Sequence, residues 1–157
     1  MKIKLLWIGK EEGDVFNDAI LQYIKKLSFY TPFETIIIPY LKNAKSISFE
    51  EQKKKEGELI LKKLENTDFV VLLDERGKEL TSVLFSQFIQ QQINTGIKNM
   101  VFIIGGAYGF SKELYTRQNY QLSLSKLTFP HIMTRLIFVE QLYRAFTILK
   151  NEPYHHE

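Results

Sequence analysis

Residues 100–109 read MVFIIGGAYG, an apolar run that leads directly into a glycine-rich turn, and Ser111 then stands where a helix could begin. A continuous apolar run of this length is typical of a strand buried on both faces of a parallel sheet. A strand, a glycine-rich turn and a helix are also the arrangement by which α/β proteins bring backbone N–H groups close to a ligand. A tight structural turn explains these glycines equally well, because the dinucleotide and P-loop fingerprints are absent.

On either side of this segment, short apolar runs alternate with helical patterns, which predicts an α/β domain with a mostly parallel sheet flanked by helices. Strands are expected at residues 3–8, 33–38, 69–73, 100–104 and 120–124. Helices are expected after an Asp14 cap, from a capping box at Ser48 to about Leu64, over 81–95, after Ser111 and over 132–149. Polar segments are expected as a loop at 42–48 and a turn at 74–77. No internal repeat or linker interrupts the pattern, so residues 1–157 are expected to form one domain.

Three segments of this pattern should meet at one edge of the sheet, because the carboxyl ends of parallel strands lie together. They are Leu73 with Asp74, Gly105 with Gly106, and the stretch 125–130. Convergent loops at strand ends are where open α/β sheets bind ligands. We expect glycine at the turn because a side chain would block both the backbone conformation and the approach of a ligand.

The composition is that of a folded globular protein, with 157 residues of which 45% are hydrophobic and 25% charged. The absence of cysteine excludes disulfides, thiolate zinc sites and a cysteine nucleophile. No apolar run is long enough for a signal peptide or a membrane span, which predicts a cytoplasmic protein with no membrane partner.

The net charge of +3 is concentrated in the C-terminal part of the chain. Residues 1–97 carry 14 basic and 14 acidic residues, whereas residues 98–157 carry 7 basic and 4 acidic ones. A basic region suits an anionic partner, and a solvated surface gives the same count. The lysines of the helix after Ser48 are balanced by Glu50, Glu51, Glu56, Glu58 and Glu65, which indicates a solvated helix face.

Other chemistries find little support in the sequence. The three histidines, His131, His155 and His156, lack metal-ligand spacing, so no metal site is predicted. Ser111 and Ser125 lack the context of a hydrolase nucleophile. The carboxylates of Asp74 and Glu75 could act as acid and base, or could serve only to solvate a turn. A bound nucleotide-like cofactor fits what remains.

Four ordered motifs lie in the second half of the chain: IIGGAYG at 103–109, LSKLTFPH at 124–131, EQLYRA at 140–145 and PYHHE at 153–157. Together with the opening strand that ends at Gly9, the KEGE step at 55–58 and the overall length, they closely resemble the bacterial large-subunit ribosomal RNA methyltransferase H family. Members of that family methylate N3 of a pseudouridine in the helix 69 loop of 23S ribosomal RNA.

The resemblance implies the fold of the SPOUT class, with a deep C-terminal trefoil knot within about residues 70–157 and a homodimer. It implies S-adenosylmethionine as the cofactor, held by three loops. Carried over residue by residue, the cofactor-binding positions are Leu73, Gly106, Ser125, Lys126, Leu127, Thr128, Phe129 and Pro130. These positions coincide with the three segments that the strand pattern brings to one edge.

The resemblance further implies 23S ribosomal RNA within the ribosome as the partner. Arg135, Tyr154 and His155 are candidates for orienting the target base or stabilising the negative charge that develops on it. No residue stands out as the acceptor of the N3 proton. The family usually carries Arg or Lys where this chain has His156, and a largely neutral histidine would weaken a phosphate contact at pH 7.

The last helix and the tail carry two further expectations. The helix is apolar on nearly all sides, and a single domain is expected to cover only one of them, so the other should meet a symmetry mate. The tail from Tyr154 is expected to contribute little to folding and to complete the RNA site of the partner subunit. Two other function classes stay open: a non-catalytic ribosome-binding protein and a flavodoxin-like nucleotide-binding protein.

Overall fold

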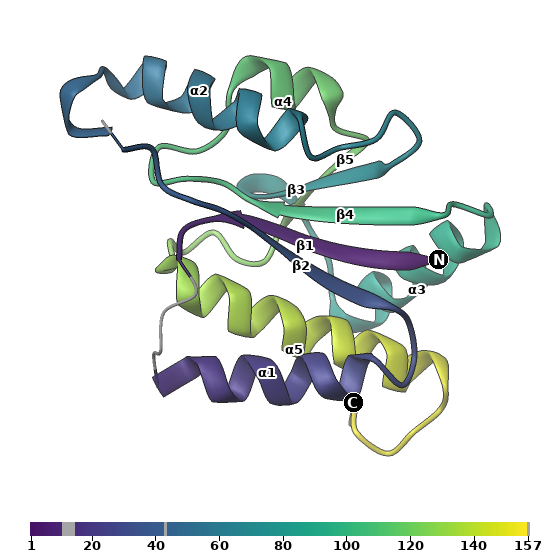
Figure 1. The fold of residues 1–157 in the computed structure, drawn as a ribbon. Helices are drawn as coiled ribbons and strands as arrows, with labels where there is room; N and C mark the ends of the chain where they lie inside the picture. The colour runs from purple at the N-terminus through teal and green to yellow at the C-terminus, as the bar shows by residue number, and fades with distance from the viewer. Residues whose placement is uncertain (11–14, 43, 157) are drawn as a thin grey trace.

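Five parallel strands form a central sheet in the order β2-β1-β4-β3-β5 (Figure 1). The computed structural model of the chain describes residues 1–10, 15–42 and 44–156. The strands are β1 (Lys2–Ile8), β2 (Phe33–Ile38), β3 (Phe69–Glu79), β4 (Asn99–Ile104) and β5 (Tyr120–Ser123). The predicted α/β class and the parallel sheet are therefore confirmed.

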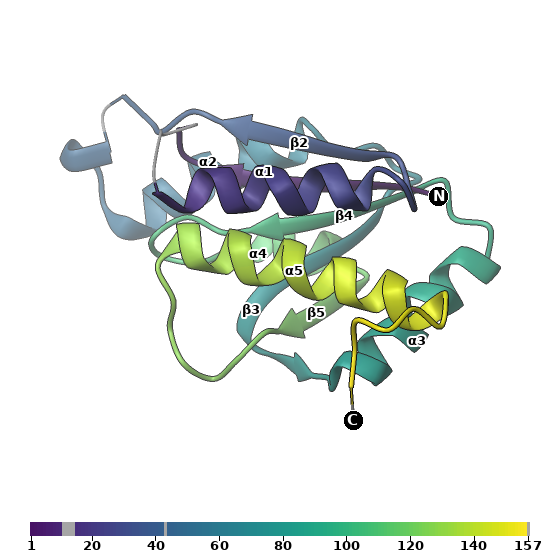
Figure 2. The ribbon, with the colours of Figure 1, turned by 90° about the horizontal axis from the view of Figure 1, so that it is seen from below.

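Helices cover both faces of this sheet, with α2 and α4 on one side and α1, α3 and α5 on the other (Figures 1 and 2). They are α1 (Val15–Leu27), α2 (Phe49–Leu61), α3 (Ser82–Asn94), α4 (Lys112–Arg117) and α5 (His131–Leu149). A short 3-10 helix, η1 (Ala44–Ser46), lies in the segment predicted as a polar loop, and α2 ends at Leu61 rather than near Leu64.

Burial on both faces explains the uninterrupted apolar run of β4. Met100, Phe102 and Ile104 belong to the core beneath α1, α3 and α5, whereas Val101 and Ile103 belong to the core beneath α2 and α4. Successive side chains of a strand point to opposite faces, so a strand covered twice needs apolar residues at every position.

The predicted helix caps at Ser48 and Ser111 are present, and Thr81, where a helix was predicted to begin, is a third cap. The side-chain oxygens of Ser48, Thr81 and Ser111 accept hydrogen bonds from the backbone N–H groups three residues later. Gly96, at φ +77°, follows the last turn of α3 as expected of a C-terminal stop. The predicted Asp14 cap lies outside the described residues.

The polar segment predicted as a turn after Leu73 is instead a bulge inside a longer strand. Leu122 of β5 is paired with both Leu73 and Lys78, so the four residues between them are inserted into β3. A Cβ on Gly77 would lie 2.6 Å from the backbone carbon of Leu122, which explains the glycine at this point. Residues 74–77 are polar because they form this bulge, and the strand continues after them to Glu79.

Helix α5 is flanked on two sides within its own chain. It lies between α1 and α3 although it follows β5, an edge strand, so residues 124–130 cross back along the edge of the sheet (Figure 2). The expectation that one domain would cover only one side of α5 is therefore wrong. Met133, Leu136 and Ile137 nonetheless remain only half-buried near its start.

Candidate active site

A cavity of about 390 Å³ opens at the carboxyl edge of the sheet, within the size range of small-molecule sites. It is lined by residues 73–76, residues 104–110, residues 124–129 without Lys126, and His131 and Thr134 of α5. The three segments that the strand pattern predicted to converge therefore share one cavity. Of the eight positions expected to hold the cofactor, Lys126 and Pro130 are not part of its wall.

The glycine turn forms the middle wall of this cavity. The backbone N–H of Gly109 donates to the carbonyl oxygen of Gly106 at 3.0 Å, and Gly109 has φ +82°, which favours glycine. Gly106 needs no such backbone conformation. A Cβ on Gly106 would lie 2.1 Å from Oε2 of Glu56, so its missing side chain makes room for a carboxyl group of the protein itself.

Glu56 is buried behind the turn, with 3% of its surface exposed. Its Oε1 accepts a hydrogen bond from Nε2 of Gln52 at 2.8 Å, and its Oε2 has no hydrogen-bond partner among the described residues. Burial raises the pKa of this carboxyl group. The expectation that Glu56 belongs to a solvated helix face is therefore wrong, although Lys53 and Lys55 do pair with Glu50 and Glu51 at the surface.

Asp74, Arg76 and Tyr115 form a hydrogen-bonded group at one side of the cavity. Asp74 is buried and accepts from the backbone N–H of Arg76 at 2.9 Å, from its guanidinium at 3.2 Å and from the Tyr115 hydroxyl at 2.5 Å. Burial alone would raise the pKa of Asp74, but these hydrogen bonds outweigh it and lower the pKa. The carboxylate is thus ionised and already paired, which leaves it poorly suited to move a proton.

The third wall is the loop that follows β5. The backbone N–H of Leu127 donates to Oγ of Ser125 at 2.9 Å, and the Ser123 hydroxyl donates to the carbonyl of Ser125 at 3.0 Å, so the turn is held by its own side chains. Leu127 is 72% exposed at the mouth of the cavity. Lys126 points away to an ion pair with Glu79 at 3.7 Å.

His131, which was not among the expected cofactor-binding residues, lines the cavity at the start of α5. Burial and the nearby Arg135 lower the pKa of His131, so its imidazole is uncharged at neutral pH. Arg135 itself is not part of the cavity wall: its guanidinium lies over the indole of Trp7, 5.0 Å from the ring centroid. The proximity of His131 to the loop of residues 124–130 in the sequence is the signal that could have identified it.

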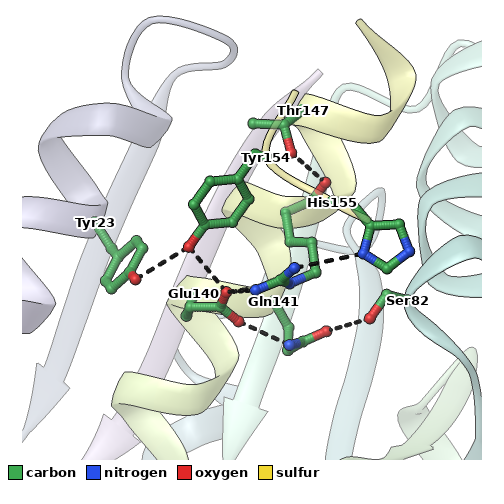
Figure 3. Close-up of polar contacts among 8 residues, drawn as sticks. Tyr23, Ser82, Glu140, Gln141, Thr147, Tyr154 and His155 are labelled. Atoms are coloured by element: carbon green, nitrogen blue, oxygen red, sulfur yellow. Dashed lines mark hydrogen bonds and ion pairs between the residues drawn. The ribbon is translucent and has the colours of Figure 1, made fainter. Parts of the chain in front are cut away.

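The tail folds back onto its own chain and contacts the middle of α5 (Figure 3). The Tyr154 hydroxyl donates to Glu140 at 3.0 Å and lies 3.2 Å from the hydroxyl of Tyr23. Its ring packs edge-on against Tyr143 and beneath the guanidinium of Arg144, 4.7 Å from the ring centroid. Burial, with these hydrogen bonds, raises the pKa of Tyr154, which therefore remains a neutral donor.

His155 is oriented by the same group of residues. Nη1 of Arg144 lies 3.4 Å from Nδ1 of His155, and a guanidinium can only donate, so Nδ1 accepts and Nε2 carries the proton (Figure 3). In this tautomer His155 can donate a hydrogen bond from Nε2. Tyr154 and His155 do not line the cavity of their own chain, whose wall takes His131 and Thr134 from the start of α5.

The described residues hold neither a metal-binding cluster nor a membrane-spanning helix. No cluster of three or more His, Asp or Glu side chains with the geometry to hold a metal ion occurs among them. Their helices also include none with the length and apolar character needed to cross a bilayer.

Comparison with known proteins places this fold and cavity in a family. The family model described as "Predicted SPOUT methyltransferase" matches residues 1–155. A protein of Christiangramia forsetii called Ribosomal RNA large subunit methyltransferase H is 56% identical over 99% of both chains. Proteins of the same name from Parabacteroides distasonis and Flavobacterium johnsoniae are each 54% identical over the full length of both chains.

A solved structure supports the fold alone. A probable methylase family protein from Haemophilus influenzae matches 99% of this chain and 70% of its own, with a TM-score of 0.53 and 12% sequence identity. The assignment of the chain to a family rests on the full-length family match and on the relatives that are 54–56% identical, and not on this structural likeness. The chain therefore belongs to the SPOUT methyltransferase family.

Proposed function

We propose that this protein uses S-adenosylmethionine to methylate N3 of a pseudouridine in the helix 69 loop of 23S ribosomal RNA, on assembled ribosomes. One observation carries the proposal: three loops meet in a cavity at the carboxyl edge of the sheet, in a chain that matches relatives named as ribosomal RNA methyltransferases from end to end. The basic excess of residues 98–157 is consistent with an RNA substrate.

The cavity fits a cofactor of this kind in size and in chemistry. Its volume of about 390 Å³ suits a nucleoside-sized ligand, and its walls combine the apolar side chains of Leu73, Ile104 and Phe129 with the backbone of the glycine turn. Leu73, Gly106 and the loop 125–130 would hold the cofactor. When bound, S-adenosylmethionine supplies an activated methyl group on a sulfonium, so the protein mainly has to position it.

The residues of this chain would then orient the acceptor and manage its charge. The pseudouridine N3 must lose a proton, and the negative charge that develops on the base needs donors nearby. His155 is suited to donate such a hydrogen bond from its Nε2–H, and Arg135 could supply a positive charge. Tyr154 gives its one hydroxyl proton to Glu140, so its part would be to orient the base.

These roles for the tail call for a homodimer. Tyr154 and His155 do not line the cavity of their own chain, so they would act at the cavity of the partner subunit. The half-buried apolar residues near the start of α5, Met133, Leu136 and Ile137, would form part of the contact between subunits. We further propose that residues 124–130 thread the predicted trefoil knot where they cross back from β5 to α5.

The test is mass spectrometry of 23S ribosomal RNA from a strain lacking its own enzyme of this kind, with and without this chain. Methylation of the helix 69 pseudouridine only in the complemented strain is the expected result. Equilibrium binding resolves a negative outcome. No affinity for S-adenosylmethionine would indicate a non-catalytic ribosome-binding protein, and preference for a phosphorylated ligand would indicate a flavodoxin-like one.

A further inference from the structure

Two aromatic side chains are stacked on each other in solvent at the rim of the cavity. The rings of Phe49, the first residue of α2, and Tyr108, in the glycine turn, have centroids 4.0 Å apart and planes inclined by 26°. Phe49 is 61% exposed and Tyr108 is 42% exposed. Neither residue belongs to the core on either face of the sheet, so packing of the fold does not account for the pair.

The location of the pair connects it to the site. Tyr108 forms part of the cavity wall, while Phe49 lies outside the wall and extends the aromatic surface away from it. The start of α2 and the turn after β4 lie at the same end of the sheet (Figure 1). The residues of that turn line the cavity. A ligand group held against Phe49 would therefore lie beside whatever occupies the cavity.

The charges around the pair favour an anionic partner. Lys42 and Lys45 are exposed in the segment that leads into α2, and neither is ion-paired with a carboxylate among the described residues. The acidic residues next to Phe49, Glu50 and Glu51, are neutralised by Lys53 and Lys55 at 2.6 and 2.8 Å. An aromatic pair at the end of a segment that carries unpaired lysines is a combination suited to the bases and phosphates of single-stranded RNA.

We propose that the stacked rings of Phe49 and Tyr108 form a platform on which an unpaired base of the RNA, next to the target nucleotide, stacks. The inference rests on the proposed function and adds a recognition surface to it. A second copy of the chain is a poorer occupant, because α2 covers the face of the sheet opposite to α5, where the subunit contact is proposed.

The main test uses Phe49, because Tyr108 also belongs to the cavity wall. For Phe49→Ala we expect the KM for ribosomes to rise about tenfold, as for the loss of one stacked base, with kcat and S-adenosylmethionine affinity unchanged. Phe49→Leu, which keeps an apolar side chain without a flat ring, should show the same rise, whereas Phe49→Trp should retain the original KM. The matched control is Phe29→Ala, which removes an 82% exposed phenylalanine from the opposite end of the sheet.

A second measurement does not depend on methyl transfer. The affinity of a 12-nucleotide single-stranded RNA is compared with that of an abasic strand of the same length. The original chain should prefer the strand with bases, and Phe49→Ala should lose that preference. An unchanged KM in Phe49→Ala, an equal effect of Phe29→Ala, weaker cofactor binding, or no preference for bases would each overturn the platform. Failure of the original chain to methylate ribosomes would instead overturn the proposed function.

Discussion

Gly106 shows how a residue can be required for a reason other than contact with a ligand. The space that a side chain would occupy is filled by Oε2 of Glu56, which reaches the turn from α2. In this geometry the Cα–H of Gly106 points at a carboxyl oxygen, a weak but recurrent contact. Any larger residue at position 106 must first displace Glu56, so a substitution there disturbs the turn before it reaches the cavity.

Gly106→Ala should therefore destabilise the protein by about 1–3 kcal/mol, the usual cost of overpacking a filled site. It should also weaken S-adenosylmethionine binding by shifting the turn. The double variant Gly106→Ala, Glu56→Ala should recover cofactor affinity, because the clash is removed, and Glu56→Ala alone serves as the control. Calorimetry on the three variants measures the coupling, and strictly additive effects would show that the two residues act independently.

The carboxyl of Glu56 also makes stability depend on pH. Burial raises its pKa above the ordinary value of 4.5, so the folded state holds the proton more tightly than the unfolded chain. The contribution of Glu56 to stability is then fully present below pH 4.5 and is lost as the pH rises through the folded pKa. Glu56→Gln should remove this loss, and its melting temperature should gain on that of the original chain as the pH rises from 4.5 to 8. A constant difference over that range would show that Glu56 does not titrate in it.

Sequence reasoning could not find Glu56 from its charge, because it lies among lysines and other glutamates on a helix with every mark of a solvated surface. Its helix face does hold a signal. Gln52, Glu56 and Ile60 are spaced by four residues and therefore share one side of α2. An isoleucine on that side indicates that the side is buried, as it is. Only the packing of that side against the glycine turn shows what the carboxyl does.

At the scale of the elements, the positions of strands and helix caps follow from local sequence patterns. The continuation of a strand beyond an irregular stretch of backbone does not. The apolar run of β3 and the cap residues are contained in a few neighbouring positions. The bulge at residues 74–77 depends on β5, about 45 residues further along the chain, which resumes pairing at Lys78. A polar turn and a polar bulge have the same composition, so only the partner strand distinguishes them.

The tail is a second element whose role depends on distant contacts. Its short polar sequence predicts a loose end that contributes little to folding, but Tyr154 joins α1 and α5 through Tyr23, Glu140 and Tyr143. Tyr154→Phe should cost about 1 kcal/mol, since the ring stays in place and only the hydrogen bonds of the hydroxyl are lost. Tyr154→Ala should cost more, about 2 kcal/mol or above, because the ring contacts are lost as well.

Denaturant unfolding measures both variants of Tyr154, with His156→Ala as the control because that side chain is exposed in the same tail. If Tyr154→Ala unfolds at the same denaturant concentration as the original chain, the tail contributes nothing measurable to stability. If the tail variants are destabilised in this assay, their activity must be measured well below their melting temperatures.

For the whole molecule, the convergence of the three loops could be predicted because a parallel sheet gathers its carboxyl ends at one edge. Most of the cavity wall follows from the same reasoning, but His131 and Thr134 of α5 do not. The position of α5 between α1 and α3 could not be predicted, because it depends on the path that the chain takes from β5 back to the centre of the molecule. On that path α5 begins at the cavity, and the tail that follows α5 is not part of the cavity wall.

If the tail works at the cavity of a partner subunit, two differently damaged chains should restore each other. Gly106→Val removes the cavity of one chain and leaves its tail, while deletion of residues 154–157 removes the tail of the other and leaves its cavity. Each variant alone should be inactive on ribosomes. In a mixture that assembles at random, half the dimers are hybrid and each has one complete site, so about a quarter of the original activity should return.

The same mixture distinguishes a tail that acts at the cavity of the partner subunit from a tail that acts at the cavity of its own chain. A tail that served its own cavity would leave every dimer of the mixture without a complete site, and no activity would return. Sedimentation establishes beforehand that each variant is a dimer at micromolar concentration, and a stable monomer would contradict the proposed contact through α5. The mixing is done during co-expression, so that hybrid dimers form as the chains fold and do not depend on exchange between finished dimers.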